Sequence, residues 1–251
     1  MLSFRIILAS LTFLAGIWLV SYPTYSKTVA PTKPDEVPAL IKSLKTGKEE
    51  DRINAAYKLG LLMPKQDVNG AFTALIKAMT DPSDQVRVNA ASALGKLNAE
   101  QAVGALIHLT HDLSSEVVLF AAQSLGDIGS PASSAVPELL NLLQNKSCNT
   151  RKVAAIALAK IGIGVEQAVP VMIEDLNLPD ESSRYEAALA IGYMGQAAQP
   201  AIPALKTILK DQSWNVQQEA CRSLRKIGTA EAFDALKEYP EDCSSRIIKQ
   251  E

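Results

Sequence analysis

The sequence predicts an all-α protein in which pairs of helices repeat along the chain as a superhelix. Three observations lead to this prediction. A short segment recurs with a period near 33 residues, apolar residues follow helical spacing between its copies, and only 5% of the 251 residues are aromatic. With so few aromatic side chains, burial must come from Leu, Ile, Val and Ala, which favours closely packed helices over sheets.

The recurring segment predicts the second helix of each pair, which we call helix B. Its copies begin at residues 51, 85, 116, 149, 182 and 215. One position near the end of each copy is usually glycine, and its occupants are Gly60, Gly95, Gly126, Ala159, Gly192 and Arg225, separated by 35, 31, 33, 33 and 33 residues. A fixed period in this range is typical of stacked repeat architectures.

A second helical pattern lies between these segments and predicts the first helix of each pair, helix A. Its copies begin near residues 36, 70, 101, 134, 167, 200 and 230. Pro137, Pro170 and Pro203 are expected in first turns, where a missing N–H costs nothing. The sequence therefore predicts about six helix pairs over residues 36–239, in which the last helix covers the final apolar face, and then a tail at 240–251.

The N-terminal segment predicts an exported protein. Residues 6–20 form an uncharged apolar run behind Arg5, as in a secretory signal. The run is shorter than the roughly 20 residues that span a bilayer, but residues 2–22 together would serve as an uncleaved anchor. Residues 1–26 are thus interpreted as a signal peptide or a membrane anchor, with a buried helix as the third reading. The proline-containing residues 27–35 are interpreted as a linker. The remainder would be periplasmic, or anchored facing away from the cytoplasm.

The charge and the cysteines of the chain limit the partners and the thiol chemistry that we expect. The net charge is -2 and no long basic run is present, so a nucleic-acid partner is not expected. An exported location would permit one disulfide, for which Cys221 and Cys243 are the nearest pair in sequence. Three unpaired thiols, Cys148 included, are an equally good interpretation. The absence of a CxxC motif gives little support to a thiol redox site.

The stretch DPSDQVRVNAASALGKL at residues 81–97, together with its counterparts, resembles the HEAT repeat in the short bacterial form that phycobilin lyases also contain. The resemblance covers about residues 36–239 and implies a right-handed α-α superhelix, a HEAT-like solenoid. It also implies a ladder in which an Asp at the end of helix A and an Arg in helix B tie neighbouring repeats together. The residues in these columns are Arg52, Asp81, Arg87, Asp112, Arg151, Arg184 and Asp211. The columns are broken by Asn145 and Leu178 in place of Asp and by Val118 and Gln217 in place of Arg, which predicts weaker ties there.

Function is expected on the variable face of helix B, where positions three or four apart share one side. The first row of this face is Asn54, Asn89, Phe120, Val153, Glu186 and Glu219. The second row is Tyr57, Ser92, Gln123, Ile156, Leu189 and Arg222, and the third is Leu61, Lys96, Asp127, Lys160, Tyr193 and Lys226. The candidate partner-binding surface is Tyr57, Phe120, Val153, Ile156, Leu189 and Tyr193. If helices B line the concave side, as the resemblance implies, these residues form an exposed apolar patch with polar flanks. The alternative is that they lean onto their neighbours and serve packing alone.

No motif in the sequence indicates catalysis. His108 and His111 supply only two ligands, with Asp112 as the nearby carboxylate, and the adjacent pair Glu174 and Asp175 is expected at a solvated helix end. No phosphate-binding loop, nucleophile elbow or dinucleotide fingerprint is present. The sequence therefore predicts a non-catalytic scaffold or adaptor that binds a protein and needs no cofactor, metal or small-molecule substrate. The resemblance alone suggests the alternative, a lyase-like accessory protein or chaperone for the bilin chromophores of antenna proteins. A purely structural envelope protein is a third hypothesis.

Overall fold

The computed structural model of the chain describes residues 32–62, 70–237 and Cys243. The predicted signal peptide or anchor at residues 1–26 lies outside these residues, as does most of the linker and of the tail. Within the described ranges the chain is helical, and extended pairing is limited to an isolated bridge between Thr32 and Leu62. None of the helices in these ranges is long and apolar enough to cross a bilayer.

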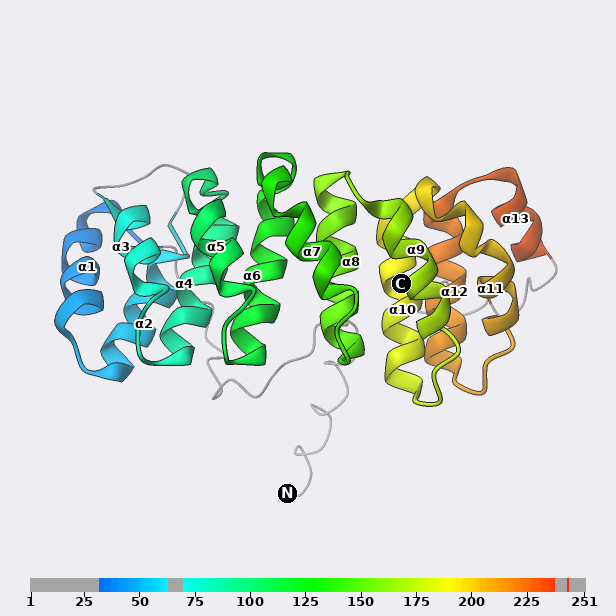
Figure 1. Cartoon of the computed structure of the whole chain (residues 1–251), viewed down its shortest axis with the longest axis horizontal. Helices are drawn as coiled ribbons and strands as arrows, with labels where there is room; N and C mark the ends of the chain where they lie inside the picture. The colour runs from blue at the N-terminus through cyan, green and yellow to red at the C-terminus, as the bar shows by residue number, and fades with distance from the viewer. Residues whose placement is uncertain (1–31, 63–69, 238–242, 244–251) are drawn as a thin grey trace, which may run out of the picture. The chain divides into compact units, whose positions relative to one another are not determined.

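The helices follow one another as pairs in the order of the chain (Figure 1). The helices A are α1 (Val37–Thr46), α3 (Ala71–Ala78), α5 (Val103–Leu109), α7 (Val136–Leu142), α9 (Val165–Asp175) and α11 (Ile202–Ile208). The helices B are α2 (Glu49–Leu59), α4 (Asp84–Lys96), α6 (Ser115–Ile128), α8 (Cys148–Ile161), α10 (Glu181–Met194) and α12 (Trp214–Ile227). The last helix is α13 (Ala230–Lys237). The predicted all-α repeat fold is confirmed.

Short 3-10 helices lead into several helices A, and they change one prediction about proline. They are η1 (Pro34–Glu36), η2 (Glu100–Ala102), η3 (Ser130–Ala135) and η4 (Gly195–Ala201). Pro137 and Pro203 lie in the first turns of α7 and α11, as predicted. Pro170 lies inside α9, so its predicted place in a first turn is wrong. In that repeat residues 165–169 stay α-helical instead of forming a 3-10 turn, and the helix begins earlier.

Neighbouring helices B touch along a seam of small residues. The seam is defined by Gly60, Gly95, Gly126 and Gly192, which face Ala93, Ser124, Ala157 and Ser223 of the next helix B. A Cβ atom at Gly95 would lie 2.7 Å from the Cα of Ser124, and one at Gly126 would lie 2.8 Å from the Cα of Ala157. No side chain fits there without moving a backbone. Glycine therefore sets the close spacing of the helix-B layer.

Two serines on the seam also join adjacent helices B by hydrogen bonds. Ser124 Oγ donates to the carbonyl oxygen of Ala91 at 2.9 Å, and Ser223 Oγ donates to that of Ala188 at 2.7 Å. Both serines are buried, so each bond replaces water that the hydroxyl would otherwise need. The seam is thus held by packing and by polar contacts.

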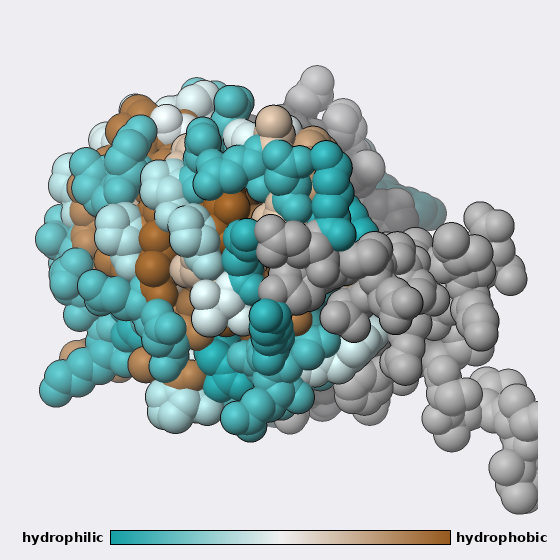
Figure 2. Space-filling model, turned by 90° about the vertical axis from the view of Figure 1, so that its right-hand side faces the viewer, coloured by the Kyte–Doolittle hydropathy of each residue, from teal (hydrophilic) through white to brown (hydrophobic). Residues whose placement is uncertain are grey.

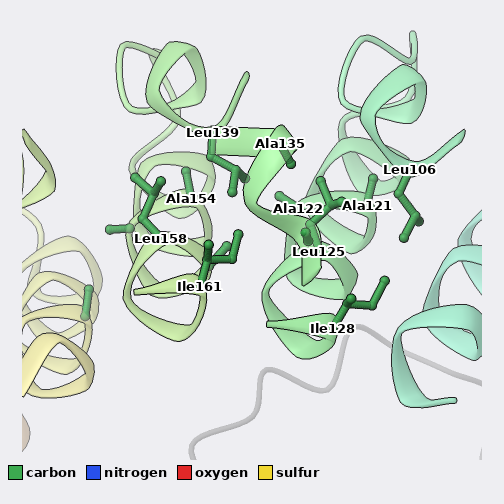
Figure 3. Close-up of a cluster of buried hydrophobic side chains, with 14 of the residues drawn as sticks. Leu106, Ala121, Ala122, Leu125, Ile128, Ala135, Leu139, Ala154, Leu158 and Ile161 are labelled. Atoms are coloured by element: carbon green, nitrogen blue, oxygen red, sulfur yellow. The ribbon is translucent and has the colours of Figure 1, made fainter. Parts of the chain in front are cut away.

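The apolar interior runs without a break along the repeats, between the layers of helices A and B. Figure 3 shows Leu106 and Leu139 from helices A approaching Leu125 and Leu158 from helices B. All four leucines are fully buried. Burying one such side chain stabilises the fold by about 2 kcal/mol. The alanines around them, such as Ala122 and Ala154, let the helices come close enough to exclude water.

The two ends of the array are closed in different ways. At the N-terminal end, Thr32 is buried and donates through its hydroxyl to the carbonyl oxygen of Lys58, so the end of the predicted linker packs on the first repeat. At the other end, α13 buries Ala232 and Ala235 but leaves Phe233 48% exposed. Figure 2, which views this end, shows apolar surface between polar side chains. The last helix therefore packs its alanines against the array and leaves Phe233 exposed.

A disulfide joins Cys221 of α12 to Cys243, with 5.6 Å between the two Cα atoms. The structure thus favours the disulfide over three unpaired thiols. Arg225 adds a second tie, because its guanidinium donates to the carbonyl oxygen of Cys243. Cys148 is a free thiol.

Candidate protein-binding surface

The predicted Asp and Arg columns meet at the turns between helices A and B. Each Arg contacts the Asp that ends the next helix A: Arg52 Nε lies 2.8 Å from Asp81, Arg87 Nε 2.8 Å from Asp112, and Arg184 Nε 2.7 Å from Asp211. A second guanidinium nitrogen binds the other carboxylate oxygen in each pair. Bidentate pairs of this kind fix orientation as well as distance.

The same side chains also close the turns within each repeat. Arg87 Nη1 donates to the carbonyl oxygen of Asp81, and the backbone N–H of Ser114 donates to Asp112 Oδ1. Hydrogen bonds from Arg87 hold the pKa of Asp112 below its ordinary value, although burial opposes the shift. The pKa of Asp211 is lowered in the same way by Arg184. These carboxylates are therefore ionised parts of the fold.

One ladder contact corrects the sequence analysis. Arg151 has Leu178 in the expected Asp column, yet Arg151 Nη2 lies 2.6 Å from Asp175 Oδ1. Asp175 is buried, so its expected place at a solvated helix end is wrong. It lies three residues before Leu178, and residues three apart share a helix face. The weaker tie expected at Leu178 is therefore replaced by a bidentate pair one turn earlier.

The remaining breaks in the columns differ from each other. Val118 of α6 and Asn145 after α7 stand where one Arg and its Asp would meet, so both members are replaced at the same junction. Val118 is buried, and Asn145 keeps the local role of Asp by accepting a hydrogen bond from the N–H of Ser147. Gln217 of α12 donates to the carbonyl oxygen of Asp211 at 2.6 Å, which preserves the turn contact of the missing Arg.

The three predicted rows lie on one face of the helices B, and we call them together the stripe. Tyr57 and Tyr193 are 37% and 49% exposed. Phe120, Val153 and Ile156 are half-buried against the core, and Leu189 is half-buried too, so these four side chains are only partly exposed. The structure therefore gives an apolar floor with tyrosines at two positions.

Two glutamates of the first row are buried, which the sequence analysis did not anticipate. Glu186 of α10 is only 5% exposed and accepts from Lys152 of α8, with 3.0 Å between Nζ and Oε1. Its other oxygen lies 3.9 Å from the Cys148 sulfur. Burial raises the pKa of the Cys148 thiol, so the thiol stays protonated and donates to the carboxylate. Both oxygens of Glu186 are thus satisfied within the protein.

Glu219 occupies the equivalent position on the next helix B. It is 2% exposed, and Arg222 Nη1 donates to its Oε2 at 3.0 Å. Burial and then the charge of Glu219 raise the pKa of the neighbouring Tyr185, so the phenol stays neutral. Two successive repeats therefore place a buried carboxylate on the stripe with a basic side chain beside it.

The third row carries charged groups at the edge of the stripe. Lys160 Nζ lies 2.7 Å from Asp127 Oδ1, and Lys226 Nζ lies 4.7 Å from the centre of the Tyr193 ring. Each lysine reaches from its own helix B to the preceding one, as residue numbers 33 apart show. These contacts are exposed and contribute little to stability.

The two histidines do not form a metal site with the residues that the structure describes. Both are exposed, and His111 Nε2 lies 3.0 Å from Glu138 Oε2 rather than near a ligand cluster. The partner is therefore Glu138 on α7, not the expected Asp112, which Arg87 occupies. In the described part of the chain no group of three His, Cys, Asp or Glu residues is placed to hold a metal ion.

Comparison with protein families identifies these helix pairs. The family of HEAT repeats matches residues 72–135, 111–177 and 169–251, which together span more than half of the chain. The chain belongs to the HEAT-repeat family. No curated protein matches it.

Solved structures agree with a HEAT-repeat fold. An engineered protein is 27% identical, with a TM-score of 0.55 over 76% of this chain and 96% of the other. The complex of CpcE and CpcF of phycocyanin lyase from Nostoc sp. PCC7120 is 24% identical, with a TM-score of 0.57 over 90% and 95%. A designed armadillo repeat protein in complex with the peptide (KR)4 is 22% identical, with a TM-score of 0.55 over 76% and 99%. The last two similarities show the fold alone.

Proposed function

We propose that this HEAT-repeat protein is a non-catalytic scaffold that binds a protein through the stripe of its helices B. The observation that carries the proposal is the contrast within each helix B. The seam repeats the same small residues, whereas the stripe changes from repeat to repeat and keeps an apolar floor at Phe120, Val153, Ile156 and Leu189. An apolar floor within a polar rim is typical of a protein-binding site.

The designed armadillo repeat protein gives this proposal further support. Its complex with the peptide (KR)4 shows that a repeat fold of this general kind can bind a peptide. The stripe passes over six helices B in sequence order. Binding of a partner along several repeats would spread the contact over a large area, which stable protein interfaces require.

The scaffold is proposed to act outside the cytoplasm, in the periplasm or at a membrane. Two features support this location. Residues 6–20 form an apolar run of the kind found in export signals, and the disulfide of Cys221 and Cys243 suits an oxidising compartment. Cell fractionation with thiol alkylation tests the location. The proposal expects full-length or processed protein in the envelope fraction with only one alkylated cysteine, and cytoplasmic protein with three would contradict it.

The bilin-lyase alternative stays a prediction. The similarity to the phycocyanin lyase complex lies at 24% identity and carries the fold only. Absorbance titration of the purified protein with a free bilin tests it directly. A saturable shift of the bilin spectrum that disappears in a stripe variant would favour this alternative over the protein-binding scaffold.

A pair of exposed tyrosines allows the scaffold proposal to be tested without disturbing the core. Tyr57→Ser with Tyr193→Ser is expected to weaken capture of the partner from envelope extract by tenfold or more, about 1.4 kcal/mol, because buried interface tyrosines are frequent hot spots. Phe233→Ser is the matched control, since Phe233 is a 48% exposed aromatic residue away from the stripe.

The melting temperature of each variant separates binding from folding. Both variants are expected to melt within a few degrees of the wild type, because the changed side chains are exposed. Equal loss of capture in the Phe233 variant would contradict the proposal. So would unchanged capture in the double tyrosine variant.

A further inference from the structure

The charges of the stripe are sorted by exposure. Its acidic residues are all buried or half-buried, and they are Asp127, Glu186 and Glu219. Its basic residues are all exposed, and they are Lys96, Lys160, Arg222 and Lys226. A partner that lies on the stripe therefore meets basic groups first, although the protein as a whole has a net charge of -2.

The buried acids cannot recruit a basic partner of their own. Glu186 uses one oxygen for Lys152 and the other for Cys148, and Glu219 is bonded to Arg222. A partner's lysine could bind these carboxylates only after their present contacts were broken. The free energy lost with those contacts would offset the free energy gained from the new one. The cations also have contacts within the protein, Lys160 with Asp127, Arg222 with Glu219 and Lys226 with the Tyr193 ring. They are nevertheless exposed, and exposed charges steer a partner and set its preference.

The basic groups of the third row lie on alternate helices B. Lys96 is on α4, Lys160 on α8 and Lys226 on α12, with Asp127 of α6 and Tyr193 of α10 between them. Adjacent packed helices are about 10 Å apart, so successive lysines are about 20 Å apart. An extended chain covers that distance in about six residues. The apolar floor runs beside this row across α6, α8 and α10.

From this arrangement we infer that the partner is an acidic protein segment that also carries apolar side chains. The inference rests on the proposed function of the stripe and adds the chemistry of its partner. The apolar side chains cover Phe120, Val153, Ile156 and Leu189, while carboxylates meet the lysines of the third row. Charge complementarity then makes the stripe prefer acidic over basic segments, and the apolar floor supplies most of the area that binding buries.

Fluorescence anisotropy with three synthetic peptides tests the inference on the full chain. The peptides are about twelve residues long, enough to cover several helices B. One alternates Leu and Glu, the second alternates Leu and Lys, and the third alternates Ser and Glu. The Leu–Glu peptide is expected to bind at least tenfold tighter than either of the others, and its affinity is expected to fall as salt is added.

Charge-reversal variants locate the binding on the stripe. The triple variant Lys96→Glu, Lys160→Glu and Lys226→Glu is expected to lose at least tenfold in affinity for the Leu–Glu peptide. The matched control, Lys42→Glu, Lys45→Glu and Lys77→Glu, changes the net charge equally on exposed positions of α1 and α3 and is expected to bind as the wild type does. If the triple variant melts at a lower temperature than the wild type, the double variant Lys96→Gln and Lys226→Gln replaces it in the binding measurement. This double variant leaves the pair of Lys160 and Asp127 intact.

Any one of three results would overturn the inference. Tighter binding of the Leu–Lys peptide would reverse the sign of the preference, and equal loss in the control variant would place the effect away from the stripe. If the tyrosine variant still loses its partner from envelope extract while neither salt nor the lysine variants change binding, the partner class inferred here is wrong and the stripe remains the binding surface.

Discussion

The seam and the stripe are two sides of the same helices B, and they follow opposite rules. On the seam, Gly95 meets Ser124 and Gly126 meets Ala157, so the same kind of small residue recurs from repeat to repeat. On the stripe, the first row changes from Asn89 to Phe120 and then to Glu186. Each repeat must therefore preserve the close approach of its helix B, whereas the stripe is free to vary once the layer is formed.

The contact of Arg151 with Asp175 is expected to give the largest effect among the contacts that hold the repeats together. The two side chains are only 14% and 6% exposed. Asp175→Ala leaves a guanidinium without its partner in a poorly hydrated site, so the free energy of unfolding is expected to fall by about 3 kcal/mol. Chemical denaturation measures the change.

Asp234→Ala is the control for that measurement. Asp234 pairs with Lys237, but both side chains are largely exposed, so its removal is expected to change the free energy of unfolding by less than about 0.5 kcal/mol. Similar losses in the two variants would show that burial does not decide the strength of these pairs.

The seam is expected to respond next. A Cβ at Gly126 would lie 2.8 Å from the Cα of Ala157, so Gly126→Ala must push two helices B apart and is expected to cost about 2 kcal/mol. Gly104→Ala is the matched control, because a Cβ at Gly104 meets no atom within 4 Å. In an exposed helix this second change is expected to stabilise the fold by up to about 1 kcal/mol. If both variants were equally stable, close contact would not be the reason for glycine on the seam.

The ladder is expected to give a smaller, pH-dependent effect. The pKa values of Asp112 and Asp211 are lowered in the folded protein by hydrogen bonds from Arg87 and Arg184. A lowered folded pKa stabilises the protein above the unfolded value of about 3.9, and the stabilisation is lost as the pH falls through the folded pKa. Asn keeps an oxygen that can accept from the Arg and removes only the charge, so Asp112→Asn with Asp211→Asn is expected to lower the free energy of unfolding by about 1 kcal/mol in total at pH 7.

The difference between this double variant and the wild type is expected to shrink as the pH falls from about 5 to below 3, because the wild-type carboxylates become protonated. Urea denaturation at several pH values follows the trend. A constant difference across this range would contradict the role assigned to the ionised carboxylates.

The repeat fold was predictable because its causes are local and recur. The period, the helical spacing and the alanines and glycines of the seam are all read from residues within one segment and its copies. The bidentate partners of Arg87 and Arg184 follow the same register. The partner of Arg151 does not follow this register. Asp175 binds Arg151 from one helical turn before the expected Asp position, and an alignment of the repeats shows only Leu178 at that position.

The stripe was predictable in place but not in chemistry. Tyr57 and Tyr193 are exposed, as their positions suggest, but Phe120 and Val153 are half-buried against the core. The burial of Glu186 depends on Lys152 of the preceding repeat, a pairing between different columns that single positions do not reveal. Contacts between repeats, rather than the pattern within one, decide which stripe residues remain available to a partner.

Photo-crosslinking tests most directly whether a partner binds on the stripe. A photoreactive phenylalanine analogue is placed at Tyr193 on the stripe or at exposed Thr207 on helix A of the next repeat, and cells are irradiated before extraction. The account predicts a discrete crosslinked partner from position 193, none from position 207, and unchanged melting for both. Crosslinks to the same partner from position 207 but not from 193 would contradict it.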